Sequence, residues 1–127
     1  VQDEKGWIAS DDMADVAAYL GMPKMAVYEV ATFYHMYNLK PMGKHTITVC
    51  TNISCQLGGA SDTVAHLESK LGIGFGGVTA DGKFGLREGE CMGACVDAPL
   101  FSIDNKRLCG CLTPEKIDQI LAELDKS

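Results

Sequence analysis

Four of the six cysteines in the chain lie in two closely spaced pairs. Cys50 and Cys55 form a C-x4-C pair, and Cys91 and Cys95 form a C-x3-C pair. Each pair follows a stretch whose residues are typical of a β-strand, so the ends of two strands would present four thiols. Because iron and zinc both accept four thiolates, the two pairs predict a four-sulfur metal site.

The spacing within the pairs leaves both metals open, since structural zinc sites include spacings of about two to four residues. A binuclear [2Fe–2S] cluster takes one pair of ligands for each iron, and longer loops within a pair leave room for bridging sulfide. Glycines beside the cysteines would let backbone N–H groups approach the sulfurs and stabilise their negative charge. These glycines are Gly58, Gly59, Gly89 and Gly93. The chemistry favours a [2Fe–2S] cluster, with a structural zinc domain as the alternative.

The cysteine pairs lie in a predicted α/β domain. Alternating, β-branched or apolar residues predict strands over 46–49 and 84–88, with a helix over 59–71 between them. A hairpin is expected over 100–108, and Thr113 is expected to cap a last helix. The order strand, helix, strand, hairpin, helix is typical of a thioredoxin-like α/β domain.

Two helices are predicted before this domain. Ser10 is expected to cap the first helix, and Pro23 is expected to open the second. The stretch 38–44 contains proline and glycine and reads as a linker. We therefore predict an N-terminal helical segment over 1–44 and a thioredoxin-like domain over 45–127.

Composition excludes several other classes of protein. The chain has 127 residues, of which 46% are hydrophobic, so one compact domain can bury a core without disulfides. The six cysteines are therefore better explained as metal ligands than as three bridges. The net charge is −6 and the basic residues do not cluster, so nothing favours nucleic acid. No apolar run approaches the roughly 20 residues of a membrane span, so direct membrane insertion is not expected.

Motifs along nearly the whole chain match one protein family. The matching stretches are residues 4–8, 27–34, 49–55, 79–84, 90–95 with 98–99, and 112–115. They resemble the thioredoxin-like [2Fe–2S] subunit of NADH:quinone oxidoreductase, which is the E-type subunit of bacterial respiratory complex I. The resemblance implies that Cys50, Cys55, Cys91 and Cys95 bind one [2Fe–2S] cluster. It also implies a further helix before Val1, which would make the present chain truncated.

The same resemblance implies an electron-transfer role within a multisubunit oxidoreductase, a quinone-reducing translocase. The expected partner is an F-type subunit that carries FMN and oxidises NADH. The expected location is cytoplasmic, in the peripheral arm of a complex in the bacterial inner membrane. The alternatives are the diaphorase module of an NAD-dependent formate dehydrogenase or hydrogenase, and a stand-alone thioredoxin-like ferredoxin.

Residues 72–77 match the pattern G-x-G-x-x-G. A dinucleotide-binding fingerprint follows a strand and opens a helix, whereas this stretch follows a predicted helix and runs into a turn. We interpret it as a flexible glycine loop and expect no NADH or flavin site on this chain. No residues with the pattern of a nucleophile or an acid–base pair stand out, and electron transfer requires none.

Cys109 and Cys111 depart from the family pattern. On a strand, C-x-C spacing would place both thiols on one face. We interpret them as small, half-buried thiols and hypothesise that neither binds the cluster; a redox-active pair or alternative ligands are the other readings. His35, His45 and His66 are not expected to be ligands, because four paired cysteines are already present. The spacing of Phe33 and Tyr34 favours a place in the helical core over a docking patch.

Overall fold

The computed structural model describes residues 1–34 and 36–126. His35, which we did not expect to bind metal, lies outside the described residues. The chain divides into two compact units, Val1–Met42 and Gly43–Ser127. Among the helices of the described residues, none has the length and apolar character needed to cross a membrane.

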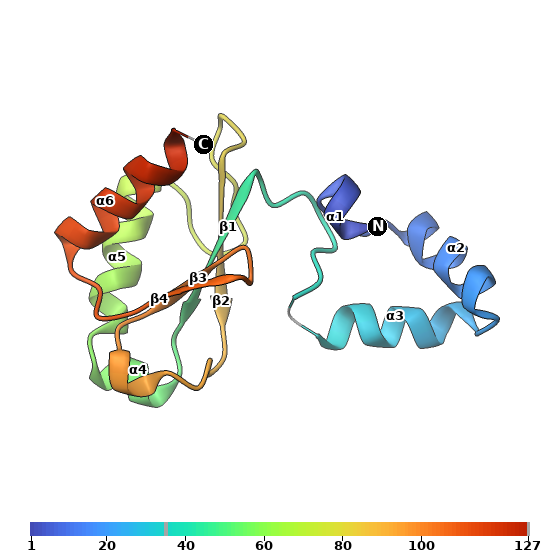
Figure 1. Cartoon of the computed structure of the whole chain (residues 1–127), viewed down its shortest axis with the longest axis horizontal. Coiled ribbons are helices and arrows are strands. Elements are labelled where there is room, and N and C mark those ends of the chain that lie inside the picture. Colours follow the sequence, from blue (N-terminus) through green and yellow to red (C-terminus); the bar gives the residue numbers. More distant parts are fainter. Residues whose placement is uncertain (35, 127) are drawn as a thin grey trace. The chain divides into compact units, whose positions relative to one another are not determined.

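The second unit is built on a four-stranded sheet with the order β2-β1-β3-β4 (Figure 1). β1 (His45–Cys50) and β2 (Phe84–Gly89) run parallel, and both agree with the predicted strands. β3 (Phe101–Ile103) pairs antiparallel with β1, and β4 (Arg107–Cys109) pairs antiparallel with β3. The predicted hairpin is confirmed as β3 and β4.

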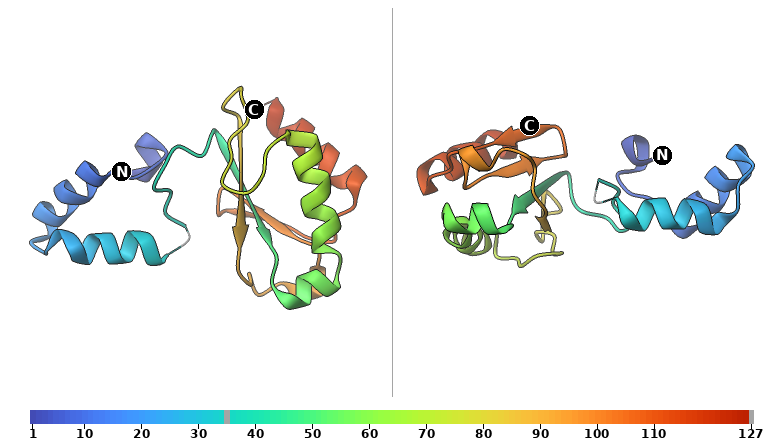
Figure 2. Two further views of the ribbon diagram at one scale, coloured as in Figure 1. Left: turned by 180° about the vertical axis from the view of Figure 1, so that it is seen from behind. Right: turned by 90° about the horizontal axis from the view of Figure 1, so that it is seen from below.

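Two long helices cover one face of this sheet, as Figures 1 and 2 show. They are α5 (Ala60–Leu71) and α6 (Pro114–Asp125). The apolar stripe of each helix packs with the sheet into one buried core. That core contains Ile47, Val49, Leu67, Phe84, Leu86, Phe101, Ile103, Cys109, Leu112, Ile117, Ile120 and Leu121. The mixed α/β arrangement predicted from the order of elements is confirmed.

The β3–β4 turn is fastened to the start of β1. Asp104 and Asn105 have φ values of 53° and 57°, in the left-handed region that asparagine and aspartate tolerate best among non-glycine residues. The carboxylate of Asp104 accepts a hydrogen bond from the backbone N–H of Thr46 at 2.8 Å. Its other oxygen lies 2.9 Å from Nδ1 of His45. The turn therefore ties the hairpin to the central strand.

The glycine stretch after α5 is paired with the edge of β2. The N–H of Gly76 donates to the carbonyl oxygen of Leu86 at 2.7 Å, and the N–H of Leu86 donates to the carbonyl oxygen of Gly77 at 3.1 Å. The stretch follows α5 and precedes β2, so it does not open a helix as a dinucleotide-binding fingerprint would. Its interpretation as a flexible glycine loop needs correction at Gly76 and Gly77, because their backbone groups are hydrogen-bonded to β2.

The first unit contains α1 (Gln2–Lys5), α2 (Ser10–Leu20) and α3 (Lys24–Phe33). The two predicted helices are present, but the start of each differs from the prediction by one residue. α2 is capped at Ala9, whose N–H donates to the carboxylate of Asp12 at 2.7 Å, so Ser10 is already helical. Pro23 is the cap of α3 and not its first residue.

The helical unit leaves much of its apolar surface open. Met13, Ala17 and Ala31 are buried between its helices. Phe33 is 80% exposed and Tyr34 is 47% exposed, so their predicted place in the core is wrong. Phe33 is the last residue of α3 and Tyr34 is its C-cap, so both lie at the end of the helix, beyond the buried side chain of Ala31.

Candidate metal centre

The parallel pairing of β1 and β2 brings both cysteine pairs to one edge of the sheet. In this register Cys50, the last residue of β1, lies opposite Gly89, the last residue of β2. Cys91 follows Gly89 closely in the sequence. Because parallel strands end at the same edge, the two strands deliver both pairs to one place.

A short helix that was not predicted holds Cys55. α4 (Ile53–Leu57) begins after Asn52, whose side-chain oxygen accepts a hydrogen bond from the N–H of Ile53 at 2.9 Å. Cys55 is fully buried and contacts the thiol of Cys50. Asparagine is a favoured N-cap residue, and this signal at Asn52 could have located the helix from the sequence.

The second pair is held by a single 3-10 turn, η1 (Cys95–Asp97). The sulfurs of Cys91 and Cys95 lie 3.4 Å apart. The backbone N–H of Gly93 donates to the sulfur of Cys91, also at 3.4 Å. Cys95 in turn contacts the thiol of Cys55, which links the two pairs. The structure therefore brings the four predicted cysteines together.

Burial and contact between thiols shift the pKa values of these cysteines in different directions. Burial raises the pKa of Cys55 to about 12, and the neighbouring Cys50 and Cys95 act in the same sense. The N–H of Gly93 lowers the pKa of Cys91, and the Cys95 thiol adds to this effect. The hydrogen bond to Cys91 raises the pKa of Cys95. Since metal ions bind thiolates, loading the site must displace protons from these thiols.

Apolar side chains enclose the inner side of the site. Cys50 and Cys55 share a buried cluster with Ala60 and Leu100. Three partly buried residues pack against that cluster: Met92, Ala94 and Ala98. Cys91, by contrast, is exposed. The site is therefore shielded from water on one side and open at the surface on the other.

The thiols fit a [2Fe–2S] cluster. Each iron of such a cluster takes two protein thiolates, and the structure supplies the thiols as two pairs. Cys50 and Cys55 would hold one iron, and Cys91 and Cys95 would hold the other. Over residues 1–34 and 36–126, no three Cys, His, Asp or Glu side chains converge as ligands of a single ion; a binuclear cluster does not require such a group.

Two of the neighbouring glycines lie at positions where a larger side chain would clash with nearby atoms. A Cβ at Gly58 would lie 2.7 Å from the Cβ of Ala98, and a Cβ at Gly89 would lie 2.5 Å from Cγ2 of Thr48. Both distances are well inside van der Waals contact. The predicted approach of a backbone N–H group to sulfur is present at Gly93, whereas Gly58 and Gly89 permit close packing.

Cys109 and Cys111 lie in different environments. Cys109 is buried at the end of β4, whereas Cys111 is exposed and has a φ of 50°. The two thiols do not lie on one strand, because β4 ends at Cys109 and the chain then turns. The N–H of Cys111 donates to the carbonyl oxygen of Asp97 at 2.5 Å, which fastens it to the turn after Cys95. The hypothesis that neither thiol binds the cluster stays a prediction.

The two described histidines have carboxylate partners within the α/β unit. His45 pairs with Asp104, as described above. Nε2 of His66, on α5, lies 2.9 Å from Oδ1 of Asp118 on α6. The hydrogen bond from His66 is the main reason that the pKa of Asp118 is lowered.

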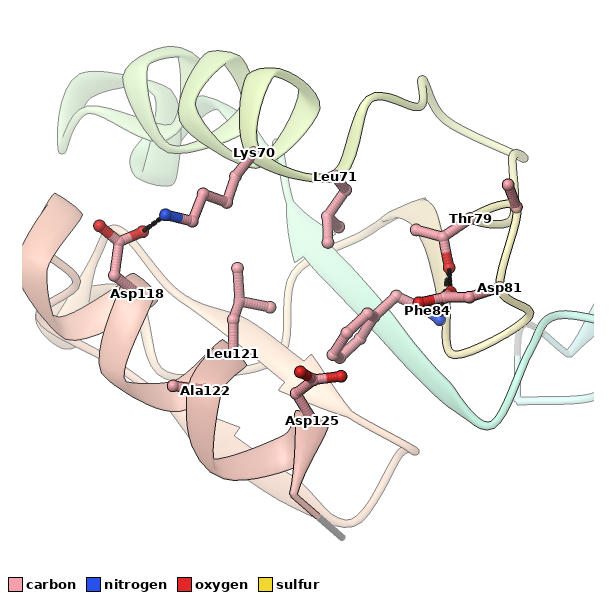
Figure 3. A pocket seen from close by; sticks show the side chains of 10 residues that line it. Lys70, Leu71, Thr79, Asp81, Phe84, Asp118, Leu121, Ala122 and Asp125 are labelled. Atoms are coloured by element: carbon pink, nitrogen blue, oxygen red, sulfur yellow. Dashed lines mark hydrogen bonds and ion pairs between the residues drawn. The ribbon is translucent and has the colours of Figure 1, made fainter.

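A pocket of about 560 Å³ opens between α5, α6 and the turn that precedes β2 (Figure 3). Leu71, Phe84 and Leu121 line it with apolar surface. Lys70 and Asp118 form an ion pair of 3.6 Å at its rim. Phe84 is the first residue of β2, so this pocket lies at the end of the sheet opposite to the cysteines.

The fold and the paired cysteines define a class of protein. The family described as thioredoxin-like [2Fe-2S] ferredoxin matches residues 1–125. The chain belongs to this family, which confirms the prediction of a [2Fe–2S] cluster.

Several relatives match nearly the whole chain, and two of them show the range of identity. The E-type subunit of NADH-quinone oxidoreductase from Rickettsia bellii is 49% identical over 119 residues, which are 94% of this chain and 71% of that protein. NADH-quinone oxidoreductase subunit 2 of Thermus thermophilus is 37% identical over 124 residues, which are 98% of this chain and 68% of that protein. The resemblance to the family of E-type subunits is confirmed.

A solved structure shares the fold. An NAD⁺-reducing [NiFe]-hydrogenase in its H2-reduced state superposes with a TM-score of 0.79 at 22% identity. The superposition covers 93% of this chain and 20% of the hydrogenase chain, so the present chain spans about a fifth of the length of that chain. The likeness confirms the predicted fold.

Proposed function

We propose that the chain is the electron-transfer subunit of an NADH-quinone oxidoreductase. In this proposal Cys50, Cys55, Cys91 and Cys95 hold one [2Fe–2S] cluster. FMN and NADH bind a partner subunit of the F type, and this chain provides no binding site for either. The complex as a whole oxidises NADH and reduces quinone.

The observation that carries the proposal is the convergence of two thiol pairs where β1 and β2 end. Sulfur atoms 3.4 Å apart in one pair, and contact between the pairs through Cys55 and Cys95, suit a two-iron centre. The names of the relatives at 49% and 37% identity support the choice of host complex.

The residues around the thiols would hold, shield and tune the cluster. When bound, the cluster stores and passes one electron. The four thiolates fix it to the chain, and the buried side chain of Leu100 keeps water from its inner side. The N–H of Gly93 stabilises negative charge on the Cys91 sulfur, and such hydrogen bonds raise the reduction potential of an iron–sulfur cluster.

Replacing single cysteines tests the ligand set. We expect the purified chain to contain about two irons and two sulfides and to show a visible spectrum that dithionite bleaches. Cys55→Ser and Cys95→Ser should each remove most of the iron and the visible absorption, because each deletes one thiolate from a pair. Iron and sulfide analysis with electron paramagnetic resonance of the reduced protein provides the measurement.

The double variant Cys109→Ser/Cys111→Ser is the matched control. It should retain the iron and sulfide content of the unmodified chain. Loss of iron in this variant would show that at least one of these thiols is a ligand. A colourless chain that contains zinc would contradict the whole proposal.

The fold shared with the NAD⁺-reducing hydrogenase favours one alternative host, a diaphorase module. Copurification distinguishes the hosts, since the tagged chain should bring down either the subunits of a quinone reductase or a hydrogenase or formate dehydrogenase. A chain that purifies as a loaded cluster protein without any flavoprotein would instead be a stand-alone ferredoxin.

The proposal includes the division of the chain and its location. Residues 1–44 form a helical segment, and residues 45–127 form the cluster-binding domain. The division of the chain into two units after Met42 supports this boundary. The bacterial relatives support a place in the peripheral arm of an inner-membrane complex, on its cytoplasmic side.

A further inference from the structure

The turn that carries Cys95 has little packing of its own. η1 is a single 3-10 turn, and none of its three residues is buried. Such a turn has poorer hydrogen-bond geometry than an α-helix, and a segment with few buried contacts opens easily. Cys50 and Cys55, by contrast, are completely buried. The part of the site that contains Cys95 therefore needs support from another part of the chain.

The segment between β4 and α6 supplies this support. The N–H of Cys111 donates to the carbonyl oxygen of Asp97, the last residue of η1, at 2.5 Å. The N–H of Leu112 donates to the carbonyl oxygen of Pro99 at 3.1 Å. Leu112 is itself buried in the core of the α/β unit. Residues 110–112, which we call the clamp, therefore connect the turn η1 to the core.

Gly110 lies directly against Asp97. A Cβ at Gly110 would lie 2.6 Å from the Cβ of Asp97 and 3.0 Å from its carbonyl oxygen. The position of both Asp97 atoms is fixed by the backbone, so no change of side-chain rotamer would relieve the clash. Any side chain at Gly110 would therefore push the turn η1 away from the clamp.

Lys116 holds the clamp from α6. Its Nζ donates a hydrogen bond to the carbonyl oxygen of Gly110 at 2.6 Å. Lys116 lies in the first turn of α6, where a positive charge is unfavourable because the N-terminus of a helix carries partial positive charge. The stability of the helix does not explain a lysine at this position, whereas the hydrogen bond to the clamp does.

We propose that Gly110 and Lys116 are positioning residues for the cluster, which hold the Cys95 thiolate in place through the clamp and the turn η1. This inference rests on the proposed function. Lys116 fixes the carbonyl group of Gly110, and Gly110 lies against Asp97. Cys111 contributes its backbone N–H, since its thiol lies 3.8 Å from the carboxylate of Asp97 and is a weak donor. Loss of these contacts frees the Cys95 thiolate, so iron leaves the site more readily.

Replacement of Lys116 tests the clamp without adding a clash. Lys116→Met removes the hydrogen bond to Gly110 and introduces another good helix former. We expect EDTA to remove iron from the loaded chain about fivefold faster, since a hydrogen bond from a charged but exposed group contributes modestly. Lys116→Arg keeps the charge and the N–H donors, so its rate should lie within about twofold of that of the unmodified chain.

Two further measurements on the loaded chain distinguish positioning of the thiolate from stability of the fold. Hydrogen exchange should become faster in Lys116→Met for the peptides that contain residues 97 and 110–112, and should stay unchanged for the rest of α6. Electron paramagnetic resonance of the reduced chain should show broadened lines, because a freed Cys95 thiolate adopts more than one geometry at its iron.

Lys106→Met is the matched control for the loss of a lysine. Lys106 lies in the turn between β3 and β4, which is fastened to the start of β1 and so lies at the end of the sheet away from the thiols. Iron release, hydrogen exchange and the resonance spectrum of Lys106→Met should equal those of the unmodified chain.

Gly110→Ala tests the contact with Asp97. We expect EDTA to remove iron about tenfold faster or more, because the added methyl group overpacks the contact and displaces η1. Gly74→Ala is its matched control, since a Cβ there meets only Glu68 at 3.9 Å. If Gly110→Ala does not fold, the two Lys116 variants decide the question.

Four outcomes would overturn the inference and leave the proposed function intact. One is iron release from Lys116→Met at the rate of the unmodified chain. Another is equally fast release from Lys106→Met or Lys116→Arg. The third is faster hydrogen exchange throughout α6 in Lys116→Met, which would mean a weakened helix. The fourth is a folded Gly110→Ala that releases iron no faster than Gly74→Ala. An unmodified chain that binds no iron would instead overturn the proposed function along with the inference.

Discussion

At the scale of single residues, the site depends on the small size of a neighbouring glycine as well as on the cysteine sulfurs. Gly89 lies opposite Cys50 in the sheet, and its missing side chain leaves room for the methyl group of Thr48. Thr48 is almost completely buried, so it has little freedom to move aside. Any side chain at Gly89 would press the two cysteine-bearing strands apart next to the site.

Gly89→Ala should therefore destabilise the protein. We expect a loss of about 1–3 kcal/mol in the free energy of unfolding, the usual cost of overpacking a buried site. We also expect reduced cluster occupancy, because the added methyl group lies between β1 and the Cys91 loop. Denaturant unfolding and iron content per chain are the measurements.

Two further variants show whether the clash is the cause. Thr48→Ser removes the clashing methyl group, so the double variant Thr48→Ser/Gly89→Ala should recover part of the lost stability. Gly74→Ala should change little, because a Cβ there meets only Glu68 at 3.9 Å. If Gly89→Ala proves as stable as the unmodified chain, the proposed role of this glycine is wrong.

At the scale of elements, each strand or helix contributes one constraint to the site. The parallel strands β1 and β2 place the cysteine pairs at one edge, and α4 turns Cys55 back toward Cys50. α6 holds the sheet from one face, through the buried side chains of Ile117, Ile120 and Leu121. A weakened α6 should therefore loosen the sheet on which the site depends.

The start of α6 offers a direct test. The hydroxyl oxygen of Thr113 accepts a hydrogen bond from the N–H of Lys116 at 3.2 Å, and Pro114 occupies the first helical turn. Thr113→Ala should lower the free energy of unfolding by about 1 kcal/mol, the typical cost of losing an N-cap. Thr113→Ser keeps the accepting oxygen and should remain within about 0.5 kcal/mol of the unmodified chain.

Thermal or denaturant unfolding of the loaded chain measures both variants. Equal stability of the Ala and Ser variants would show that the cap contributes nothing at this position. The sequence alone predicts that Thr113→Ala lowers stability, because threonine followed by proline is typical of a helix start. The structure confirms that α6 begins there.

At the scale of the whole molecule, the chain consists of two compact units. Within the described residues, the buried side chains of the α/β core and of the cluster around Cys50 and Cys55 lie between residues 47 and 121. The helical unit buries Met13, Ala17 and Ala31. It also lines an apolar groove of about 370 Å³, whose residues all lie between 1 and 37.

This separation predicts that residues 43–127 fold alone. The shortened chain should bind the cluster with the visible spectrum of the full chain, because all four proposed ligands and their packing partners are retained. Circular dichroism and iron analysis of the two chains check the prediction. An unfolded or iron-free fragment would show that the helical unit is needed for the α/β unit to form.

The local patterns of the sequence determined most of the elements and the chemistry of the site. Alternation over 46–49 and 84–88 predicted β1 and β2, and Thr113 predicted the start of α6. Paired cysteines predicted a sulfur site, and the motifs along the chain identified the family. These features depend on residue type and on spacing within a few residues, and such information is present in the sequence itself.

Tertiary structure decided the features that depend on contacts between distant residues. It decided that Gly58 and Gly89 are needed for space, because the atoms they would meet belong to Ala98 and Thr48. It separated Cys109 from Cys111, because β4 ends between them. Phe33 is exposed in the tertiary structure. The apolar periodicity of a helix does not decide burial, because burial depends on which other elements pack against each helix face. Spacing along the chain revealed which residues carry the chemistry, whereas packing across the sheet decided where each thiol lies and which side chains remain open for a partner.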